Sequence, residues 1–500
     1  MTVVPRRSLQ IGLVVVVWFA ALARGAQDQW AVSFLCGWLS LLLGTFLYFN
    51  YKHKQSIVLP LIWHFVVLLI GILISARYSF DINTTRLEIT SFVCAFATFF
   101  LFSNLFQTQT ARNELIQYAG FVVFPLSAIA VMQYFSKNSF IGGEFHLLRS
   151  ISFSHWSASS TFTNSSLLAG FSLSWILLAW DRRKERYFQW VFAACVLNLL
   201  LSRSWWAFIS LPIGFMFYYR KKYKSFYPQS FTYISAIVSL TVFSIALFMK
   251  FGPGRDPSYI ADSRLGWWKA GIRMFFAHPW VGIGLGAYGT AFPFFKPLVA
   301  QNTLYAHSFP VQIVSEIGLI GLVGVLLIVG VSWFRLSSQP SPTSESRTYL
   351  ATLLMLLTFS LTTIFMEYLI SKLMLVMVLS LALSSSSFKG FSISANCVRW
   401  STIALILLIP TWYLPFYSSQ FDALGLKYEI TGQFSEAQKS FEQAYALNPY
   451  EDDSCRGLAR LSMHRYEISH SLLDISRSLL WANAALQLKQ ITLSYSEKTK

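Results

Sequence analysis

Two arginines have the side-chain chemistry and the positions needed to bind an anion. Arg264 begins a run in which Trp and Phe recur at helical intervals, which predicts an amphipathic helix along a membrane interface. At the first turn of such a helix, a guanidinium group and free backbone N–H groups together favour an anion. Arg203 lies between two apolar runs with almost no loop around it, so its charge is expected to face a bundle interior or a wet cavity. Because guanidinium matches phosphate geometry in a bidentate manner, the two residues predict a phosphate site.

His307 is the candidate for proton transfer. It precedes the apolar run of residues 309–334, and a neutral imidazole there can take a proton from a hydroxyl group. The alternative for a histidine at the start of a helix is capping or packing. Glu316 lies further along the same run, where a carboxylate needs a partner or a functional reason. It could orient a polar network below His307 or hydrogen-bond a neighbouring helix.

Each of these polar residues also has a plainer interpretation. Arg264 and Arg273 could contact lipid headgroups, and Arg203 could extend its charged end to the membrane surface. Asn164, at the start of another apolar run, is expected to cap that helix, with contact to a sugar or phosphate as the alternative. Glu367, at the end of a further run, is a weaker candidate of the same kind.

Glycines follow the predicted amphipathic helix and recur in the next apolar run. His278-Pro279 with Gly282, Gly284 and Gly286 predicts a turn that redirects the loop, in preference to ligand contact. Small residues let helix backbones approach closely, so Gly318, Gly321 and Gly324 are interpreted as helix-packing positions.

The composition indicates an integral membrane protein. Of the 500 residues, 55% are hydrophobic and 12% charged, whereas soluble domains carry about 25% charged residues. The formal charge of +17 falls mostly in short loops between apolar runs, which indicates membrane topology and contact with anionic lipids rather than binding of nucleic acid. The five cysteines show neither metal-ligand spacing nor a disulfide framework, and we expect no metal and no cofactor.

The apolar runs predict an all-α bundle of about 12–13 membrane-spanning helices. The first run resembles a signal peptide, although an uncleaved first span is the preferred interpretation. The predicted spans are residues 11–23, 30–49, 57–74, 87–106, 115–135, 166–180, 187–201, 204–219, 231–249, 309–334, 349–366, 370–386 and 399–416.

Basic clusters fall on alternate loops, which predicts a cytoplasmic N-terminus. The loops of residues 136–165 and 250–308 and the tail after residue 416 are then extracytoplasmic. Arg203, Arg264 and His307 therefore share one face of the membrane, and function is expected to face outward.

The tail is predicted to be a separate helical module. Small residues, large residues and a final proline follow the spacing of a tetratricopeptide repeat, in which small residues let two antiparallel helices approach. Residues 418–490 would then bind a protein partner, and the alternative is a solvated helical tail without one. The charged, Ser-containing end at residues 491–500 is expected to be disordered. The residues that carry the spacing are Phe421, Leu424, Gly425, Tyr428, Gly432, Ala437, Phe441, Ala444 and Pro449.

Short motifs resemble the O-antigen ligase/polymerase superfamily of bacterial membrane glycosyltransferases over residues 161–383. Their order, spacing and shared sidedness carry the resemblance. It implies residues 1–417 as a ligase-like membrane domain, with its core at 161–383 and a large periplasmic loop at 250–308. The motifs are Thr161-Phe162-Thr163-Asn164, Ser202-Arg203-Ser204, Ser263-Arg264, His278-Pro279-Trp280-Val281-Gly282-Ile283-Gly284, Ala306-His307-Ser308 and Glu316-Ile317-Gly318-Leu319-Ile320-Gly321.

The resemblance implies transfer of a glycan from an undecaprenyl-pyrophosphate donor to a lipid, glycan or protein acceptor. The reaction would take place at the outer face of the bacterial inner membrane, without metal or nucleotide sugar. Arg203 and Arg264 would hold the pyrophosphate and His307 would activate the acceptor hydroxyl group. Ser308 stands where the family usually has Asn, and the helical tail departs from the common ligase outline. Supporting residues would be Arg273, Glu316, Asn164 and Ser308.

Other functions remain open at this stage. A polymerase of O-antigen or exopolysaccharide would use a second lipid-linked glycan as acceptor, and a protein O-oligosaccharyltransferase would use a protein. A transporter of lipid-linked glycans should carry polar residues along its spans. The ionisable residues instead gather at one face, which favours an enzyme. A scaffold that recruits partners through the tail would leave the two arginines and His307 without a joint explanation.

Overall fold

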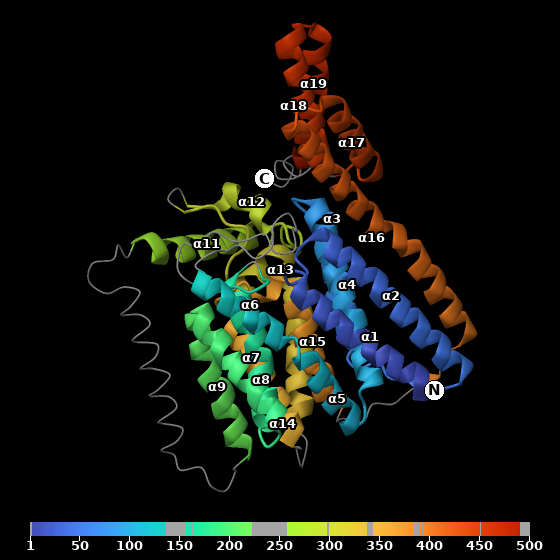
Figure 1. Ribbon diagram of the computed structural model, residues 1–500, viewed down its shortest axis with the longest axis vertical. Coiled ribbons are helices and arrows are strands. Elements are labelled where there is room, and N and C mark those ends of the chain that lie inside the picture. Colours follow the sequence, from blue (N-terminus) through green and yellow to red (C-terminus); the bar gives the residue numbers. More distant parts are fainter. Residues whose placement is uncertain are drawn as a thin grey trace.

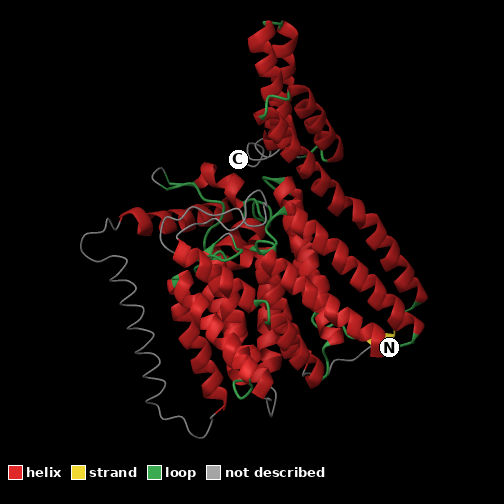
Figure 2. Ribbon diagram, in the orientation of Figure 1, coloured by secondary structure: helices red, strands yellow, loops and turns green. Residues whose placement is uncertain are grey.

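The protein is a bundle of long helices with a helical projection at one end (Figure 1). The computed structural model describes residues 3–136, 157–162, 164–222, 258–297, 300–337, 344–384, 391–392, 394–450 and 452–490. Figure 2 shows that these residues are almost entirely helical. Two short strands, β1 (Ser56–Ile57) and β2 (Phe391–Ser392), pair in antiparallel fashion near the N-terminus.

The bundle consists of helices from both halves of the chain. They are α1 (Val3–Leu22), α2 (Gln29–Lys52), α3 (Ile62–Arg77), α4 (Ile82–Leu105), α5 (Gln109–Gly120), α6 (Val123–Ser136), α7 (Ser165–Asp181), α8 (Arg186–Ser202), α9 (Trp205–Lys222), α13 (Phe309–Ser337), α14 (Ser344–Ser360), α15 (Leu369–Ser384) and α16 (Ala395–Ile430). Two further helices, α11 (Ser258–Ala277) and α12 (Tyr288–Phe295), lie across one end, and a 3₁₀ turn, η2 (Phe365–Glu367), joins α14 to α15.

Two helices form the centre of the bundle. Both α7 and α15 are apolar around most of their circumference, and a helix of that kind is expected to be buried. Nearly every residue of each is buried, including Trp175 of α7. Around them, α4 packs on α15, α14 packs on α7 and α9, and α13 packs on α3. The ends of these helices hold the segments that form the site described below.

The helices meet the requirements for a membrane bundle. Within the described residues, Gln29–Lys52, Ile82–Leu105, the segment Gln109–Phe135 and Phe309–Leu336 are long and apolar enough to cross a bilayer, and shorter apolar helices pack beside them. Large apolar side chains such as Trp63, Trp190 and Phe334 are exposed, as a lipid-facing surface requires. The prediction of an all-α polytopic membrane protein is therefore confirmed. The predicted span at residues 231–249 lies outside the described residues.

The predicted span at residues 115–135 contains a break. Helix α5 ends at Gly120 and α6 begins at Val123. The carbonyl groups that the break releases at Gln117 and Tyr118 accept hydrogen bonds from other helices, as described below. The apolar pattern runs through the break unchanged, so the sequence did not reveal it.

One helix joins the bundle to the projection. Helix α16 packs on α2 and continues beyond the bundle as the first helix of the C-terminal module, followed by α17 (Phe434–Leu447), α18 (Asp452–Ser469) and α19 (Leu472–Gln490). The proposed domain boundary at residue 417 falls within this unbroken helix. Phe441 packs between Gly425 and Gly457, where an added Cβ atom would lie 2.8 Å and 2.6 Å from its ring. Residues 491–500, expected to be disordered, lie outside the described residues.

Candidate functional site

A loop inserts its backbone into a break in α13. Gly318 interrupts the helix with φ 60° and ψ −161°, which releases backbone groups on both sides of it. On the far side, Leu319 N donates to the Pro279 carbonyl (2.9 Å) and Ile320 N donates to the Trp280 carbonyl (3.3 Å). Non-helical backbone at membrane depth is tolerated only where other protein groups satisfy it.

The loop also bonds to the helical turn before the break. Ile283 N donates to the Ser315 carbonyl (2.9 Å) and Gly284 N donates to the Glu316 carbonyl (3.0 Å). The Ser75 hydroxyl group of α3 donates to the same Glu316 carbonyl (2.7 Å). Residues 279–284 and the broken helix thus form one hydrogen-bonded unit.

Glycines are required where the loop and the helix meet. Gly282 has φ +68°, and a Cβ atom there would lie 2.3 Å from the Glu316 carbonyl group. The predicted turn is therefore confirmed. Gly318 makes the same close approach from the other side, 2.5 Å from Trp280, so its interpretation as a helix-packing residue was wrong. Gly321 and Gly324 do pack on α3, against Gly71 and Leu68.

Glu316 is buried beneath the loop and held by several donors. Its side-chain carboxylate accepts from Gln312 Nε2 (2.6 Å) and Tyr288 N (3.3 Å), and the Gly286 backbone also bonds to it. Gln312 Oε1 in turn accepts from Ala306 N (2.6 Å), next to His307. The carboxylate thereby fixes which amide atom of Gln312 faces the loop. Sequence reasoning missed Gln312, although its spacing of four residues from Glu316 within an apolar run was the available signal.

His307 has a constrained position at the start of α13. Its backbone has φ 54°, in the left-handed region that costs non-glycine residues energy. Its ring stacks on Trp267 of α11, with centroids 4.5 Å apart and 24° between the planes. Trp268 Nε1 donates to the Ala306 carbonyl (3.0 Å). Burial, with a smaller effect of the Arg264 charge, lowers the pKa of His307 from its ordinary 6.5 to about 4.

Arg264 lies on the same face of α11 as this stack and reaches two other segments. Its Nη1 donates to the Thr362 carbonyl (3.1 Å), and its guanidinium carbon lies 5.9 Å from the Trp206 ring centre. The sequence predicted Arg264 in the first turn of this helix. The helix instead begins at Ser258, so Arg264 lies well beyond the first turn. Helix-compatible residues follow Pro257 directly, which explains the earlier start.

Arg203, three residues before Trp206, was expected to face the bundle interior or a wet cavity, and the structure does not place it there. It ends α8 with φ 50°, and its side chain is exposed rather than turned into the bundle interior. Arg203 is the last residue before the sharp turn into α9 and has the left-handed conformation in which many helices end. The structure therefore places one arginine half-buried beside His307 and the other on the open surface.

The supporting residues are spread over the same end of the molecule. Asn164 Oδ1 accepts from Ser166 N (2.7 Å) and caps α7. Ser308 is buried, and its carbonyl accepts from Gln312 N (2.9 Å) in the first turn of α13. Arg273 donates to the Phe295 carbonyl (3.2 Å) at the end of α12, a favourable position for a cation.

The acidic and basic residues of the neighbouring spans are paired. Lys372 of α15 forms an ion pair with Glu88 of α4, and it also donates to the Glu367 carbonyl (3.5 Å). In the part of the chain that the structure describes, no group of three or more His, Cys, Asp or Glu side chains could hold a metal ion.

The fold and this site define an all-α polytopic membrane protein with a polar, arginine- and histidine-containing site at one end of the bundle. Residues 156–326 match the model of the family described as O-antigen ligase, and this match supports the resemblance of that segment to the O-antigen ligase superfamily. The match includes Arg203, Arg264, His307 and Glu316, and it ends before α14 and the C-terminal module. Among curated proteins, none matches the chain significantly. The family supports a membrane glycosyltransferase or ligase in polysaccharide synthesis.

The inserted loop makes a prediction about stability. Gly282→Ala adds a Cβ atom 2.3 Å from the Glu316 carbonyl at a positive φ, so we expect a loss of at least about 2 kcal/mol in unfolding free energy. Gly330→Ala is the matched control in α13, since nothing lies within 4 Å of the added atom. It should be neutral or stabilising by up to about 1 kcal/mol. Thermal unfolding in detergent measures both, and equal stability of the two variants would contradict the inserted-loop geometry.

Proposed function

We propose that the protein transfers a glycan from an undecaprenyl-pyrophosphate donor to an acceptor hydroxyl group at the periplasmic face of the bacterial inner membrane. The observation that carries this proposal is the convergence of Arg264 and His307. They come from α11 and from the loop before α13, and Trp206 and Thr362 complete the surroundings of Arg264. A cation and a neutral imidazole side by side are what transfer from a diphosphate leaving group requires.

Arg264 has a charge available for the donor. Within the described part of the chain, its guanidinium donates to a neutral carbonyl group and forms no ion pair. A half-buried cation without a counter-charge favours an anionic ligand. As the bond from the anomeric carbon to the diphosphate oxygen breaks, negative charge grows on that oxygen, and a fixed cation stabilises it. Exposed Arg203 would contribute a second cation to the same pyrophosphate.

His307 would take the proton of the acceptor hydroxyl group as its oxygen bonds to the anomeric carbon. With a pKa of about 4 the imidazole is neutral at pH 7, so it can accept a proton. The bound diphosphate would offset the Arg264 charge and raise the pKa of His307 toward the range in which proton transfer is effective. Gln312 and Glu316 would hold the imidazole in position through Ala306.

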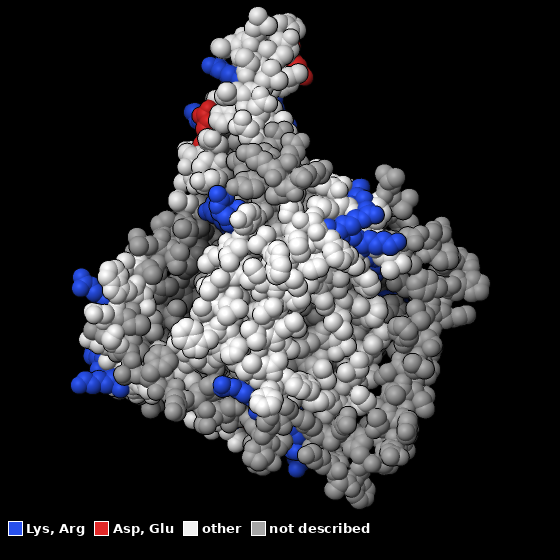
Figure 3. All heavy atoms as spheres, turned by 180° about the vertical axis from the view of Figure 1, so that it is seen from behind, with Lys and Arg blue, Asp and Glu red and all other residues white. Residues whose placement is uncertain are grey.

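The charged ends of the bundle support this orientation in the membrane. Figure 3 shows a broad area without charged side chains across one face, with Lys and Arg at its margins. Arg112 and Arg182 lie at the end opposite α11 and α12, where both bond to Glu345 (3.1 Å and 3.7 Å). By the positive-inside rule, this supports a cytoplasmic position for that end, so the site and the C-terminal module would face the periplasm. The tetratricopeptide-like module would bind a protein partner.

The remaining alternative activities differ in the acceptor of the glycan. A lipid acceptor makes the protein a ligase, a second lipid-linked glycan makes it a polymerase, and a protein makes it an O-oligosaccharyltransferase. We favour the ligase because it is the activity that the family description gives.

The transfer reaction tests the two central residues. With purified protein, lipid-linked glycan and candidate acceptors, His307→Ala should lower transfer about 10²–10⁴-fold, the range for a lost general base. Arg264→Ala should lower it about 10²–10³-fold and weaken donor binding. Lys269→Ala, which removes an exposed cation of the same helix, is the control and should stay within a few-fold of wild type. Full activity of both site variants would reject this active site.

The pH dependence of kcat/KM reports the pKa of the free enzyme. Because burial lowers the pKa of His307 to about 4, the base stays unprotonated well into the acidic range. We expect a nearly constant rate from about pH 8 to pH 5.5 and a decline as pH falls through about 4. A decline centred on 6.5, the ordinary value, would show that the acting imidazole is not buried as described. Thermal unfolding at each pH separates this effect from loss of fold.

A further inference from the structure

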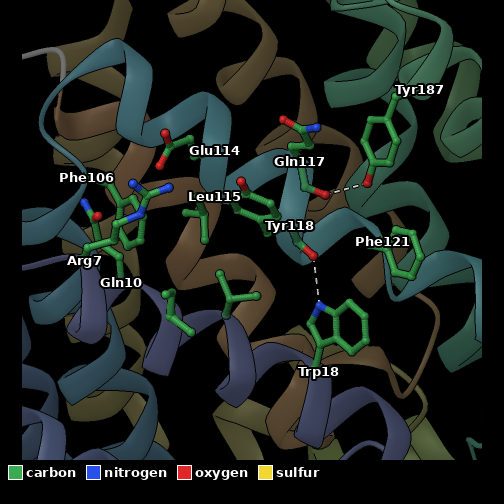
Figure 4. Close-up of a pocket in the computed structure, with 12 residues that line it drawn as sticks. Arg7, Gln10, Trp18, Phe106, Glu114, Leu115, Gln117, Tyr118, Phe121 and Tyr187 are labelled. Carbon is green, nitrogen blue, oxygen red and sulfur yellow. Dashed lines mark hydrogen bonds between the residues drawn. The ribbon is translucent and has the colours of Figure 1, made fainter.

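A groove lies at the end of the bundle opposite the candidate site. It has a volume of about 600 Å³ and runs between α1 and α5 (Figure 4). Arg7, Gln10 and Glu114 lie toward one end, Gln117 lies beside Tyr187, and the other lining residues are apolar or aromatic. The lining residues are Arg7, Gln10, Ile11, Val14, Trp18, Phe106, Glu114, Leu115, Gln117, Tyr118, Phe121 and Tyr187.

The break between α5 and α6 lies next to the groove, and hydrogen bonds from other helices hold this wall. The Tyr187 hydroxyl group donates to the Gln117 carbonyl (2.5 Å), and Trp18 Nε1 donates to the Tyr118 carbonyl (2.9 Å). The rings of Trp18 and Phe121 stack with centroids 5.6 Å apart and 2° between their planes. These contacts satisfy the carbonyl groups released at the helix end, so the polar backbone is not available to a ligand along this wall.

The polar end carries two opposite charges that do not pair. Figure 4 shows that Arg7 comes from α1 and Glu114 from α5, the two helices on either side of the groove. No ion pair within 4.0 Å joins them among the interactions of the described residues. Gln10, beside Arg7 in the lining, donates to the Leu105 carbonyl (2.8 Å) and is held in place. A cation and an anion that line one apolar groove without forming an ion pair are complementary to a zwitterion.

We propose that this groove binds a phospholipid whose zwitterionic headgroup carries a primary ammonium group, as in phosphatidylethanolamine. The phosphate would lie at Arg7, because guanidinium matches phosphate geometry. The ammonium group would donate to the Glu114 carboxylate, and an acyl chain would follow Ile11, Val14 and the Trp18–Phe121 stack. The groove volume is within the range of about 300–1,000 Å³ of small-molecule sites.

The headgroup chemistry distinguishes this lipid from its neighbours in a bilayer. A choline headgroup has no N–H group to donate to Glu114, and a glycerol headgroup has no positive charge. A bound lipid would also fill the space between α1 and α5. The proposal depends only on this groove and is independent of the transfer reaction.

Native mass spectrometry of the delipidated full-length protein in detergent tests the proposal. Phosphatidylethanolamine, phosphatidylcholine and phosphatidylglycerol with the same acyl chains are titrated separately. We expect the ethanolamine lipid to bind at least about tenfold more tightly than the choline lipid, a difference of one good hydrogen-bonded charge contact. Equal affinities for the three lipids, or tightest binding of the glycerol lipid, would overturn the proposal.

Substitutions of residues that line the groove test whether the lipid binds there. Glu114→Gln should abolish the preference for ethanolamine over choline while some binding remains, and Arg7→Gln should weaken both lipids about tenfold. Glu185→Gln and Lys52→Gln change charges at the same end but outside the groove lining, so they are the matched controls. Ile11→Trp fills the groove without changing charge and should remove the ethanolamine preference even if one of the charge variants does not fold. A preference that survives both Glu114→Gln and Ile11→Trp would place the lipid elsewhere and refute the site.

Discussion

The structure depends on the backbone pairing between residues 279–284 and the broken helix α13. A break inside a membrane-spanning helix exposes N–H and C=O groups where water is scarce, and each unsatisfied group costs several kcal/mol. The loop supplies carbonyl groups to Leu319 and Ile320 and takes those of Ser315 and Glu316. The loop and the broken helix therefore satisfy each other's backbone groups. Since α11 precedes the loop and His307 precedes α13, this pairing also fixes how far the two halves of the site lie from each other.

The strained backbone of His307 is held in place by hydrogen bonds and ring contacts of the surrounding residues. Its left-handed backbone is unfavourable for a residue with a Cβ atom, and it persists because the surroundings determine it. The Ala306 N–H is taken by Gln312, the Ala306 carbonyl is taken by Trp268, and the imidazole is covered by Trp267. The Trp residues of α11, which look in the sequence like membrane anchors, bond and stack against the His307 loop instead. A single amphipathic helix thus carries the arginine and the supports of the imidazole.

The sequence predicts the elements of this site better than their arrangement. The turn at Gly282 could be predicted because closely spaced glycines are a local signal for turns. The helical bundle could be predicted from the long apolar runs. The break at Gly318 could not be foreseen, since it is stable only through partners some forty residues earlier. Gln312 was missed for the same reason: its role comes from a long-range contact with Ala306 through the fold. Arg203 itself is the left-handed residue at the end of α8, and the pattern of apolar residues does not reveal this conformation.

The buried charges next to the site bear on the choice between an enzyme and a transporter. A path for a polar substrate through the membrane needs polar groups that are free to exchange partners. Glu88 and Lys372 are instead paired with each other, and Glu316 is held by Gln312 and backbone N–H groups from the α12 region. The adjoining cavity of about 150 Å³ is lined mainly by apolar residues of α3, α4, α13 and α15, and Glu88, Glu316, Glu367 and Lys372 also contribute to its lining. The charged residues next to the candidate site are therefore held mainly by one another and by neighbouring polar groups. Such an arrangement favours chemistry at one face over passage across the bilayer.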